Sequence, residues 1–159
     1  MLFRSSDAVL ASAELFHRLD MAWDDACARN DDLVFTVGKL FTDAKAHSIT
    51  KVPGETRFAI DFRSQDLQVL NRMVDLAQQL TREIGERRRV CFELGQFNIS
   101  EPAMMSGAVQ AALEAGASRL SIPQMRIASG AGHDAQDFAH AGIPSGMIFV
   151  RNEIGRAHV

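Results

Sequence analysis

The segment from Ser129 to Ala135 combines small residues with two titratable side chains, in the order Ser-Gly-Ala-Gly-His-Asp-Ala. Small residues let a backbone approach a ligand closely, and the amides of a following helix N-terminus attract an anion. At the rim of such a loop, His133 and Asp134 could hydrogen-bond a substrate carbonyl or carboxylate. No lysine follows the glycines, so the segment does not fit a phosphate-binding loop. From spacing alone, the favoured interpretation is a tight strand-to-helix turn with His133 as an exposed cap.

Arg63 closes a segment in which apolar and polar residues alternate. A guanidinium on a rigid strand can bind a carboxylate through two parallel hydrogen bonds. The alternative, favoured on these residues alone, is an ion pair with Asp61 on a solvated sheet face. His47 and Thr50 lie in the connection before Pro53 and, taken by themselves, are ordinary polar loop residues.

The five histidines of the chain raise the question of metal ligation. None lies in a His-x-His or His-Glu-x-x-His arrangement, and no acidic pair stands nearby in the required order. His17 and His140 fit the surfaces of helices. No hydroxyl nucleophile has a base beside it in the sequence. We therefore expect neither a catalytic residue nor a metal ligand within this chain.

The composition is that of a folded protein, since 47% of the 159 residues are hydrophobic and 23% are charged. A net charge of −3 gives no attraction to nucleic acid or to a membrane surface. The basic run Arg87 to Arg89 lies between a predicted helix and a predicted strand and fits a solvated surface. Two cysteines without paired spacing argue against a disulfide framework or a Cys-based zinc site. With no apolar stretch of membrane-spanning length and no signal-peptide pattern, we expect a cytoplasmic protein without nucleic-acid or membrane partners.

A helix and a strand come first among the elements that must position these residues. From Asp7 to about Arg29 apolar residues recur every three or four positions, which predicts a helix with Ser6 or Asp7 as its N-cap. Leu33 to Val37 is a short apolar run closed by a glycine, which predicts a buried strand. The face assigned to the helix comprises Val9, Ala13, Phe16, Leu19 and Trp23.

A strand, a helix and another strand follow the Pro53-Gly54 turn. Alternation from Arg57 to Arg63 predicts a strand with one apolar face. The second helix is predicted to start after Ser64 or Asp66 and to end at Gly85. Its apolar face comprises Leu70, Met73, Val74, Ala77, Leu80 and Ile84, and the third strand has Val90, Phe92 and Leu94 on one side.

The order helix, strand, strand, helix, strand over residues 7–94 lacks one initial strand of a ferredoxin-like sandwich. The missing strand would fall where the chain starts, which agrees with a truncated chain.

After Glu101 the pattern changes to alternating helices and strands. Met104 to Ala115 predicts a helix ended by Gly116, and His133 to Ala141 predicts a second helix. Short strands are predicted at Met125 to Ala128 and at Gly146 to Val150. Such an order adds to a parallel sheet, and a sheet of two strands is not stable alone. This half therefore needs elements that the chain does not contain.

Both ends match sequencing-adapter read-through. Ile154 to Val159 is what one reading frame of a common short-read adapter would encode, and Met1 to Ser5 matches the reverse-complement read from a GTG start. We expect residues 1–6 and 154–159 to be adapter-derived and not to belong to the fold. The alternative is that they are native, and continuous genomic sequence across both junctions would establish it.

Three segments, in order and spacing, resemble one known family. They are Thr36 to Lys39, then Val52 to Glu55 running into Ile60 to Ser64, then Ser129 to Ala135 with Pro144 to Phe149. Together they resemble the hydantoinase/carbamoylase branch of the M20 metal-dependent amidohydrolases, which includes N-carbamoyl-L-amino-acid hydrolases, β-ureidopropionases and allantoate amidohydrolases. The similarity runs from about Asp7 to Glu153, and the Ser-Gly-Ala-Gly-His-Asp-Ala string is rather specific to this branch.

The resemblance implies an α/β (α+β) architecture in two parts. Residues 7–98 would form a ferredoxin-like satellite domain that lacks its first strand, mediates homodimer formation and closes over the substrate. Residues 99–153 would form the C-terminal part of a zinc-peptidase-like α/β catalytic domain.

The resemblance also implies roles for individual residues. Arg63 would bind the carboxylate of a small-molecule substrate, and Gly132 and His133 would help to hold that substrate across the domain cleft. Thr50 stands where allantoate- and carbamoyl-type members usually have asparagine, and a hydroxyl lacks the paired donor and acceptor of an amide. His47 is the neighbouring residue that could compensate.

In the family, the metal ligands and the general-base glutamate precede the satellite domain, except for one histidine in a Gly-Ser-His motif after the last strand. Arg151 to Glu153 resembles the approach to that motif, and His158 stands near the ligand position but inside the suspected adapter segment. In the whole enzyme one or two divalent ions, zinc or manganese, would activate water to attack an amide or ureido carbon. We expect this chain alone to be inactive.

The expected function is therefore a part of an amidohydrolase that cleaves non-peptide C–N bonds of N-carbamoyl amino acids, ureido acids or allantoate-like substrates. The alternative is a non-catalytic ferredoxin-like module for dimerisation or for binding a small carboxylate, since fold does not fix function. Upstream coding sequence with a histidine, an aspartate and a glutamate pair would favour the enzyme.

Overall fold

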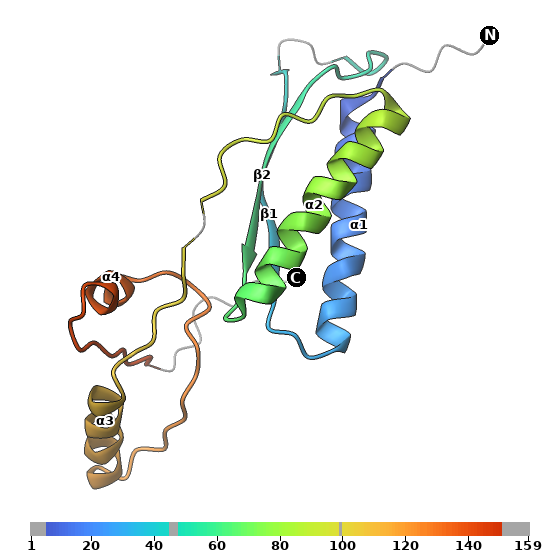
Figure 1. Ribbon diagram of the computed structural model, residues 1–159. Coiled ribbons are helices and arrows are strands. Elements are labelled where there is room, and N and C mark those ends of the chain that lie inside the picture. The colour runs from blue at the N-terminus through green and yellow to red at the C-terminus, as the bar shows by residue number, and fades with distance from the viewer. Residues whose placement is uncertain (1–5, 45–47, 99, 151–159) are drawn as a thin grey trace. The chain divides into compact units, whose positions relative to one another are not determined.

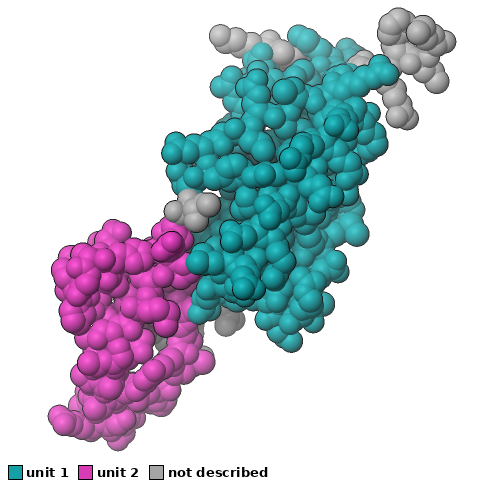
Figure 2. Space-filling model, viewed as in Figure 1, with its two compact units in different colours: residues 1–99 teal, residues 100–159 magenta. Residues whose placement is uncertain are grey.

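The computed structural model describes residues 6–44, 48–98 and 100–150 of the chain. The chain divides into two compact units, Met1–Ile99 and Ser100–Val159, which Figure 2 shows in teal and magenta. The first unit contains α1, β1, β2 and α2 in that order, and the second contains α3 and α4 (Figure 1). The predictions for residues 1–5 and 151–159, His158 included, lie outside the described residues.

Helix α1 spans Ala8–Ala28, which confirms the first predicted helix. Asp7 is its N-cap: the Asp7 carboxylate accepts a hydrogen bond of 3.0 Å from the backbone N–H of Leu10. Beyond the helix, the indole Nε1 of Trp23 donates to the carbonyl of Leu33 at 2.9 Å. This bond fixes the helix against the start of the following strand.

Strands β1, Val34–Thr42, and β2, Thr56–Arg63, form a two-stranded antiparallel sheet. Phe35 is paired with Phe62, and their rings stack with centroids 5.5 Å apart. The register shifts between Val37 and Lys39, so one residue of β1 is left out of the pairing. Because this bulge absorbs the extra residue, pairing continues to Thr42, five positions beyond the predicted end of the strand.

Helix α2 spans Leu67–Arg88, with the Asp66 carboxylate accepting a hydrogen bond of 2.7 Å from the N–H of Gln68. The predicted cap at Asp66 is confirmed, but the predicted end at Gly85 is wrong. The helix continues to Arg88, and Arg89 takes the left-handed conformation with φ of 58°. A Cβ on Gly85 would lie 2.9 Å from the carbonyl oxygen of Val90, so this glycine makes room for the returning chain.

The basic run Arg87 to Arg89 belongs to the end of α2, not to a turn between a helix and a strand. Arg87 and Arg88 both form ion pairs with the carboxylate of Glu14 on α1. The positive charges also lie in the last helical turn, where the helix dipole favours cations. These two arginines therefore link α2 to α1 through ion pairs.

The core of the first unit lies between the helix pair and one face of the sheet. Leu15 and Leu19 of α1 and Leu80 and Ile84 of α2 are almost completely buried. The predicted face of α2 is confirmed, whereas Ala13, assigned to the buried face of α1, is exposed. The buried face of α1 is shifted because α1 packs against both α2 and the sheet. The core comprises Ala11, Leu15, Leu19, Ala26, Leu33, Val69, Met73, Leu80 and Ile84, and Phe16, Phe35, Phe58, Ile60, Phe62, Val90 and Phe92 pack against it.

The predicted third strand is not formed among the described residues. Val90 and Phe92 do pack against the core and Cys91 is exposed, so the predicted alternation is present, although Leu94 is also exposed. The segment has no ladder partner in the described part of the chain, and a strand requires one. The ferredoxin-like order is therefore only partly realised: two helices cover a two-stranded sheet.

The second unit contains helix α3, Gly107–Arg119, and the short helix α4, Asp134–His140. Helix α3 starts later than predicted and continues through Gly116, so the predicted helix end at this glycine is wrong. Neither predicted strand, at residues 125–128 and 146–150, is formed in the described part of this unit. No described residue of either helix is buried, and the large apolar side chains remain accessible. This agrees with the expectation that two strands cannot form a sheet alone.

Local contacts hold the segments of the second unit to α3. Arg126 donates to both carboxylate oxygens of Glu114, at 2.5 and 2.9 Å. The N–H of Ser106 donates to the carbonyl of Ser145 at 2.8 Å. A Cβ on the neighbouring Gly146 would lie 2.7 Å from a methyl group of Val109, so the absence of a side chain lets this segment approach the helix.

Among the described helices, none has the length and apolar character needed to cross a membrane.

Candidate functional site

Arg63 is the last residue of β2 and lies on the sheet face opposite the core. Its Nε donates to Oδ2 of Asp61 at 2.5 Å, and the two side chains are 50% and 47% exposed. The ion pair with Asp61 that the sequence favoured is therefore present. Both groups remain accessible enough for a carboxylate ligand to reach the guanidinium.

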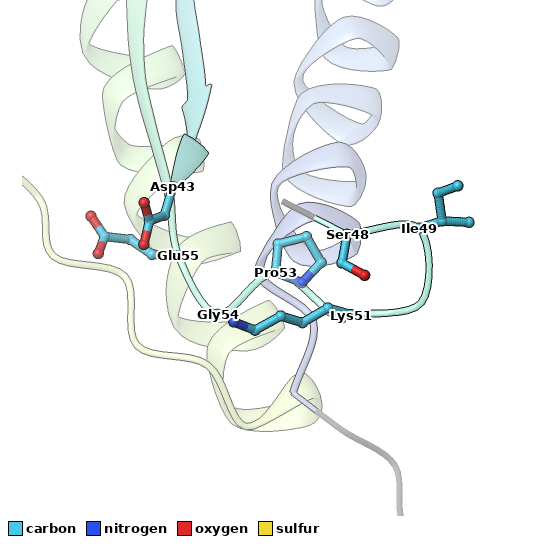
Figure 3. Close-up of a pocket in the computed structure, with 7 residues that line it drawn as sticks. All are labelled: Asp43, Ser48, Ile49, Lys51, Pro53, Gly54 and Glu55. Carbon is cyan, nitrogen blue, oxygen red and sulfur yellow. The ribbon is translucent and has the colours of Figure 1, made fainter. Parts of the chain in front are cut away.

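Thr50 lies in the connection between β1 and β2, and its N–H contacts the hydroxyl of Ser48 at 3.5 Å. His47 lies outside the described residues. A hollow of about 420 Å³ is formed by this connection, and Figure 3 shows the carboxylates of Asp43 and Glu55 on one side of it and Ser48 and Ile49 on the other. Its lining comprises Asp43, Ser48, Ile49, Lys51, Pro53, Gly54 and Glu55.

The structure does not bring Thr50 and Arg63 together. The connection that carries Thr50 ends where β2 begins, and Arg63 is at the other end of this eight-residue strand. At 3.3 Å per residue, the seven steps from Thr56 to Arg63 span about 23 Å. A small molecule bound to Arg63 therefore cannot touch Thr50 of the same chain.

The Ser129 to Ala135 segment forms a compact turn that leads into α4. Gly130 has φ of 64°, which a side chain would disfavour. The Ser129 hydroxyl donates to the carbonyl of Ala131 at 2.7 Å and accepts from its N–H at 3.3 Å. His133 occupies the N-cap position of α4 with extended backbone and is exposed, as the simpler interpretation predicted. The rings of His133 and Phe149 form a T-shaped pair, with centroids 6.0 Å apart.

Two residues at this turn were not found from the sequence. Gln136 lies in the first turn of α4, four positions after Gly132. It donates from Nε2 to the hydroxyl of Ser100 and the carbonyl of Glu101. Phe149 was predicted only as part of a strand. The position of Gln136 on the first turn of α4 was a usable signal, but its partners lie 35 and 36 positions away and no local pattern indicates them.

The side chains that could bind a metal ion are not grouped together in the described part of the chain. Within residues 6–44, 48–98 and 100–150, no three His, Cys, Asp or Glu side chains are grouped so that they could hold a metal ion. The residues present therefore do not fit the zinc or manganese site that the resemblance implies for the whole enzyme.

Comparison with known proteins relates nearly the whole chain to amidohydrolases. The chain is 32% identical over 155 residues to an allantoate amidohydrolase of Escherichia coli K12, covering 96% of this chain and 36% of that protein. It is 31% identical over 129 residues to an N-carbamoyl-L-amino-acid amidohydrolase of Paenarthrobacter aurescens, covering 81% and 31%. The chain thus spans about a third of the length of these curated relatives. No family model matches it.

Solved structures lead to the same group. An amidase of the hydantoinase/carbamoylase family from Burkholderia vietnamiensis has a TM-score of 0.77 and 28% identity, covering 89% of this chain and 33% of that one. AtUAH in complex with (S)-hydroxyglycine has a TM-score of 0.80 and 28% identity, covering 91% and 33%. Sequence and fold together place the chain among the amidohydrolases. It belongs to the hydantoinase/carbamoylase family of these enzymes.

Proposed function

We propose that this chain is the substrate-recognition part of an enzyme that hydrolyses linear C–N bonds of carboxylate-bearing ureido compounds. The candidate substrates are N-carbamoyl amino acids, ureido acids and allantoate-like molecules. The observation that carries the proposal is the position of Arg63, half-exposed at the end of a strand, in a chain 32% identical to an allantoate amidohydrolase.

The chemistry of Arg63 fits a carboxylate anchor. A guanidinium presents N–H groups in a planar fork that matches the two oxygens of a carboxylate. Asp61, two residues earlier on the same face of the sheet, accepts a hydrogen bond from Nε of Arg63. This contact limits the rotation of the guanidinium. AtUAH, a structural relative, is recorded in complexes with glyoxylate and (S)-hydroxyglycine, which are both small carboxylates. The fixed arginine would orient the acid end of a substrate for attack at its ureido carbon.

Gly132 and His133 are proposed to contact the other part of the substrate. The turn at Gly130 exposes backbone, and the His133 ring is accessible while Phe149 supports it. Thr50 and His47 are proposed as further substrate-binding residues. Because the length of β2, about 23 Å from Thr56 to Arg63, lies between the connection that carries Thr50 and Arg63, both could contact one substrate only if they come from two copies of the chain.

The remaining features are parts of the same proposal. Residues 7–98 would be a ferredoxin-like satellite domain that forms a homodimer, and residues 99–153 would belong to a zinc-peptidase-like catalytic domain of the M20 type. The zinc or manganese ions that the activity requires would be held by residues other than those described, and a cytoplasmic location is expected.

The proposal is tested by hydrolysis assays on the full natural protein that carries this chain, with zinc or manganese supplied. Ammonia release is measured from allantoate and from N-carbamoyl-L-amino acids, each beside the matching amide, in which the carboxylate is replaced. We expect turnover of the acids and little turnover of the amides. Equal rates for acids and amides would contradict carboxylate recognition.

A non-catalytic module remains the second candidate, and the lack of a three-residue ligand group in the described chain favours it for the chain taken alone. The 159-residue chain is therefore assayed in parallel and is expected to be inactive. If this chain alone hydrolysed a substrate, the proposal that it binds substrate without catalysing the reaction would be wrong. Binding of a carbamoyl amino acid, without turnover by the full protein, would support the module.

A further inference from the structure

The turn that carries Gly132 and His133 is connected to a distant segment of its own unit through the side chain of Gln136. The Gln136 Nε2 donates to the hydroxyl of Ser100 and to the carbonyl of Glu101, in both cases at 2.7 Å. The backbone N–H of Gln136 donates to the carbonyl of His133 at 2.8 Å. One residue therefore bonds to the turn by its backbone and to residues 100–101 by its side chain.

The same amide group packs against Gly132. A Cβ on Gly132 would lie 3.4 Å from Oε1 of Gln136, so the amide oxygen lies directly beside this glycine. Gln136 is half-buried, whereas Gly132 and His133 are exposed. The amide thus lies beside Gly132 and the backbone N–H bonds to His133, while both candidate substrate contacts remain accessible to a ligand.

We propose that Gln136 is a positioning residue that sets the place of Gly132 and His133 by fixing their turn to residues 100–101. The inference rests on the proposed function, in which Gly132 and His133 hold the substrate. Its chemical basis is the donor requirement: the carbonyl of Glu101 accepts only from an N–H or O–H group, which the Gln136 amide supplies. Leucine has a similar size but no donor, and an ionised glutamate has only acceptors.

The chain offers a matched control in Gln124. Its Nε2 also donates to a backbone carbonyl and a serine hydroxyl, those of Glu114 at 3.1 Å and Ser118 at 3.4 Å. Both partners belong to α3, not to the turn. Gln124→Leu therefore removes the same kind of side-chain amide, with its two donated hydrogen bonds, from the same unit, and it leaves Gly132 and His133 unchanged.

The first measurement does not depend on any activity. Amide hydrogen exchange of residues 130–133 and the imidazole C–H signal of His133 are compared by NMR in the wild-type chain, Gln136→Leu, Gln136→Glu and Gln124→Leu. We expect about tenfold faster exchange in both Gln136 variants, together with a shifted His133 signal as its contact with Phe149 loosens. Gln124→Leu should leave both unchanged. Ser100→Ala, which removes one of the two partners, should give a smaller change than Gln136→Leu.

The second measurement uses the full natural protein and a substrate that it hydrolyses. Gln136→Leu should raise KM about tenfold and change kcat less, whereas Gln124→Leu should change KM by less than about twofold. Unchanged exchange and an unchanged His133 signal in Gln136→Leu would overturn the inference. A loosened turn with an unchanged KM would also overturn it. If the wild-type protein hydrolyses none of the ureido substrates, the proposed function fails, and the exchange comparison still decides whether Gln136 holds the turn.

Discussion

Arg63 and Asp61 form an ion pair within one strand, with Nε of the arginine 2.5 Å from Oδ2 of the aspartate. Residues two apart on a strand lie on the same face, so the pairing follows directly from the order Asp-Phe-Arg. Both side chains are about half-exposed, and solvent therefore keeps the contribution of the pair to stability small. A guanidinium has five N–H donors, so Arg63 can bind a second carboxylate while Asp61 holds its Nε.

Replacing Arg63 by lysine should weaken the recognition of carboxylate substrates. Lysine keeps the positive charge but lacks the planar fork, so the two parallel hydrogen bonds to a carboxylate are lost. In the full natural protein we expect Arg63→Lys to raise KM for N-carbamoyl amino acids by roughly tenfold to a hundredfold. Steady-state kinetics on the acid substrates measure the change.

Arg57→Lys is the matched control for this substitution. Arg57 lies on the same strand and likewise pairs with a carboxylate two residues earlier, that of Glu55. Its replacement should leave KM within about twofold of the wild-type value. Equal effects of the two substitutions would show that Arg63 has no special role in substrate binding.

Replacing Gly85 by alanine should destabilise the first unit by about 1–3 kcal/mol, since the new Cβ would press on backbone. The contact is with the carbonyl oxygen of Val90, 2.9 Å from an ideal Cβ, and backbone cannot move as freely as a side-chain end. Urea unfolding followed by circular dichroism measures the difference. Gly116→Ala, within α3 and with nothing inside 4 Å, should be neutral or stabilising by up to about 1 kcal/mol. A neutral Gly85→Ala would contradict the close approach of the chain to α2.

Removing a buried leucine from α1 should be more costly. Leu19 is 0% exposed at the contact between α1 and α2, so Leu19→Ala leaves a cavity and should cost about 2–5 kcal/mol. Leu10, on the same helix, is 54% exposed, and Leu10→Ala should change the free energy of unfolding by less than about 0.5 kcal/mol. Similar losses from the two substitutions, in the same urea titration, would contradict the assigned buried face.

The ion pair between Arg18 of α1 and Glu83 of α2 should be visible in the pH dependence of the protein. A hydrogen bond of 2.7 Å from Arg18 lowers the pKa of the Glu83 carboxyl. Since the folded pKa lies below the unfolded one, the stabilisation is complete above the unfolded pKa. It is lost as the pH falls through the folded pKa. The two side chains are 35% and 48% exposed, so solvent keeps the effect on stability small, and it should weaken further in 1 M salt.

Arg18→Gln should return the pKa of Glu83 toward its ordinary value. Carboxyl carbon shifts followed by NMR during an acid titration report it directly. Glu114 serves as the internal control, because its pKa is lowered by a hydrogen bond from Arg126 in the other unit and should not respond. A Glu83 titration that is unaltered by Arg18→Gln would contradict the pair.

Local patterns predicted the two helices and the two paired strands of the first unit. The caps at Asp7 and Asp66 are side chains that bond to backbone two or three residues away, so a short window of sequence contains all the information. The Arg63–Asp61 pair is predictable for the same reason. Gly85 misled the prediction because a glycine fits both a helix end and a close contact, and only the position of Val90 decides between them.

Features that depend on distant partners were missed. The segment around Phe92 has the alternation of a strand, but pairing requires a neighbour that the described residues do not provide. The predicted strands at residues 125–128 and 146–150 are likewise not formed among the described residues. At the candidate site, the side-chain partners of Gln136 lie 35 and 36 positions away. The separation of Thr50 from Arg63 follows only from the course of β2, which is about 23 Å long from Thr56 to Arg63.

The bulge in β1 makes one position of this strand dispensable. Val37 is paired with Ile60 and Lys39 with Ala59, so Gly38 has no opposite residue. Deleting Gly38 would leave every cross-strand pair and every inward-facing side chain in register. Deleting a residue of β1 away from the bulge would move the side chains on one side of the gap to the wrong face. Natural length variation within this strand is therefore expected to fall at Gly38.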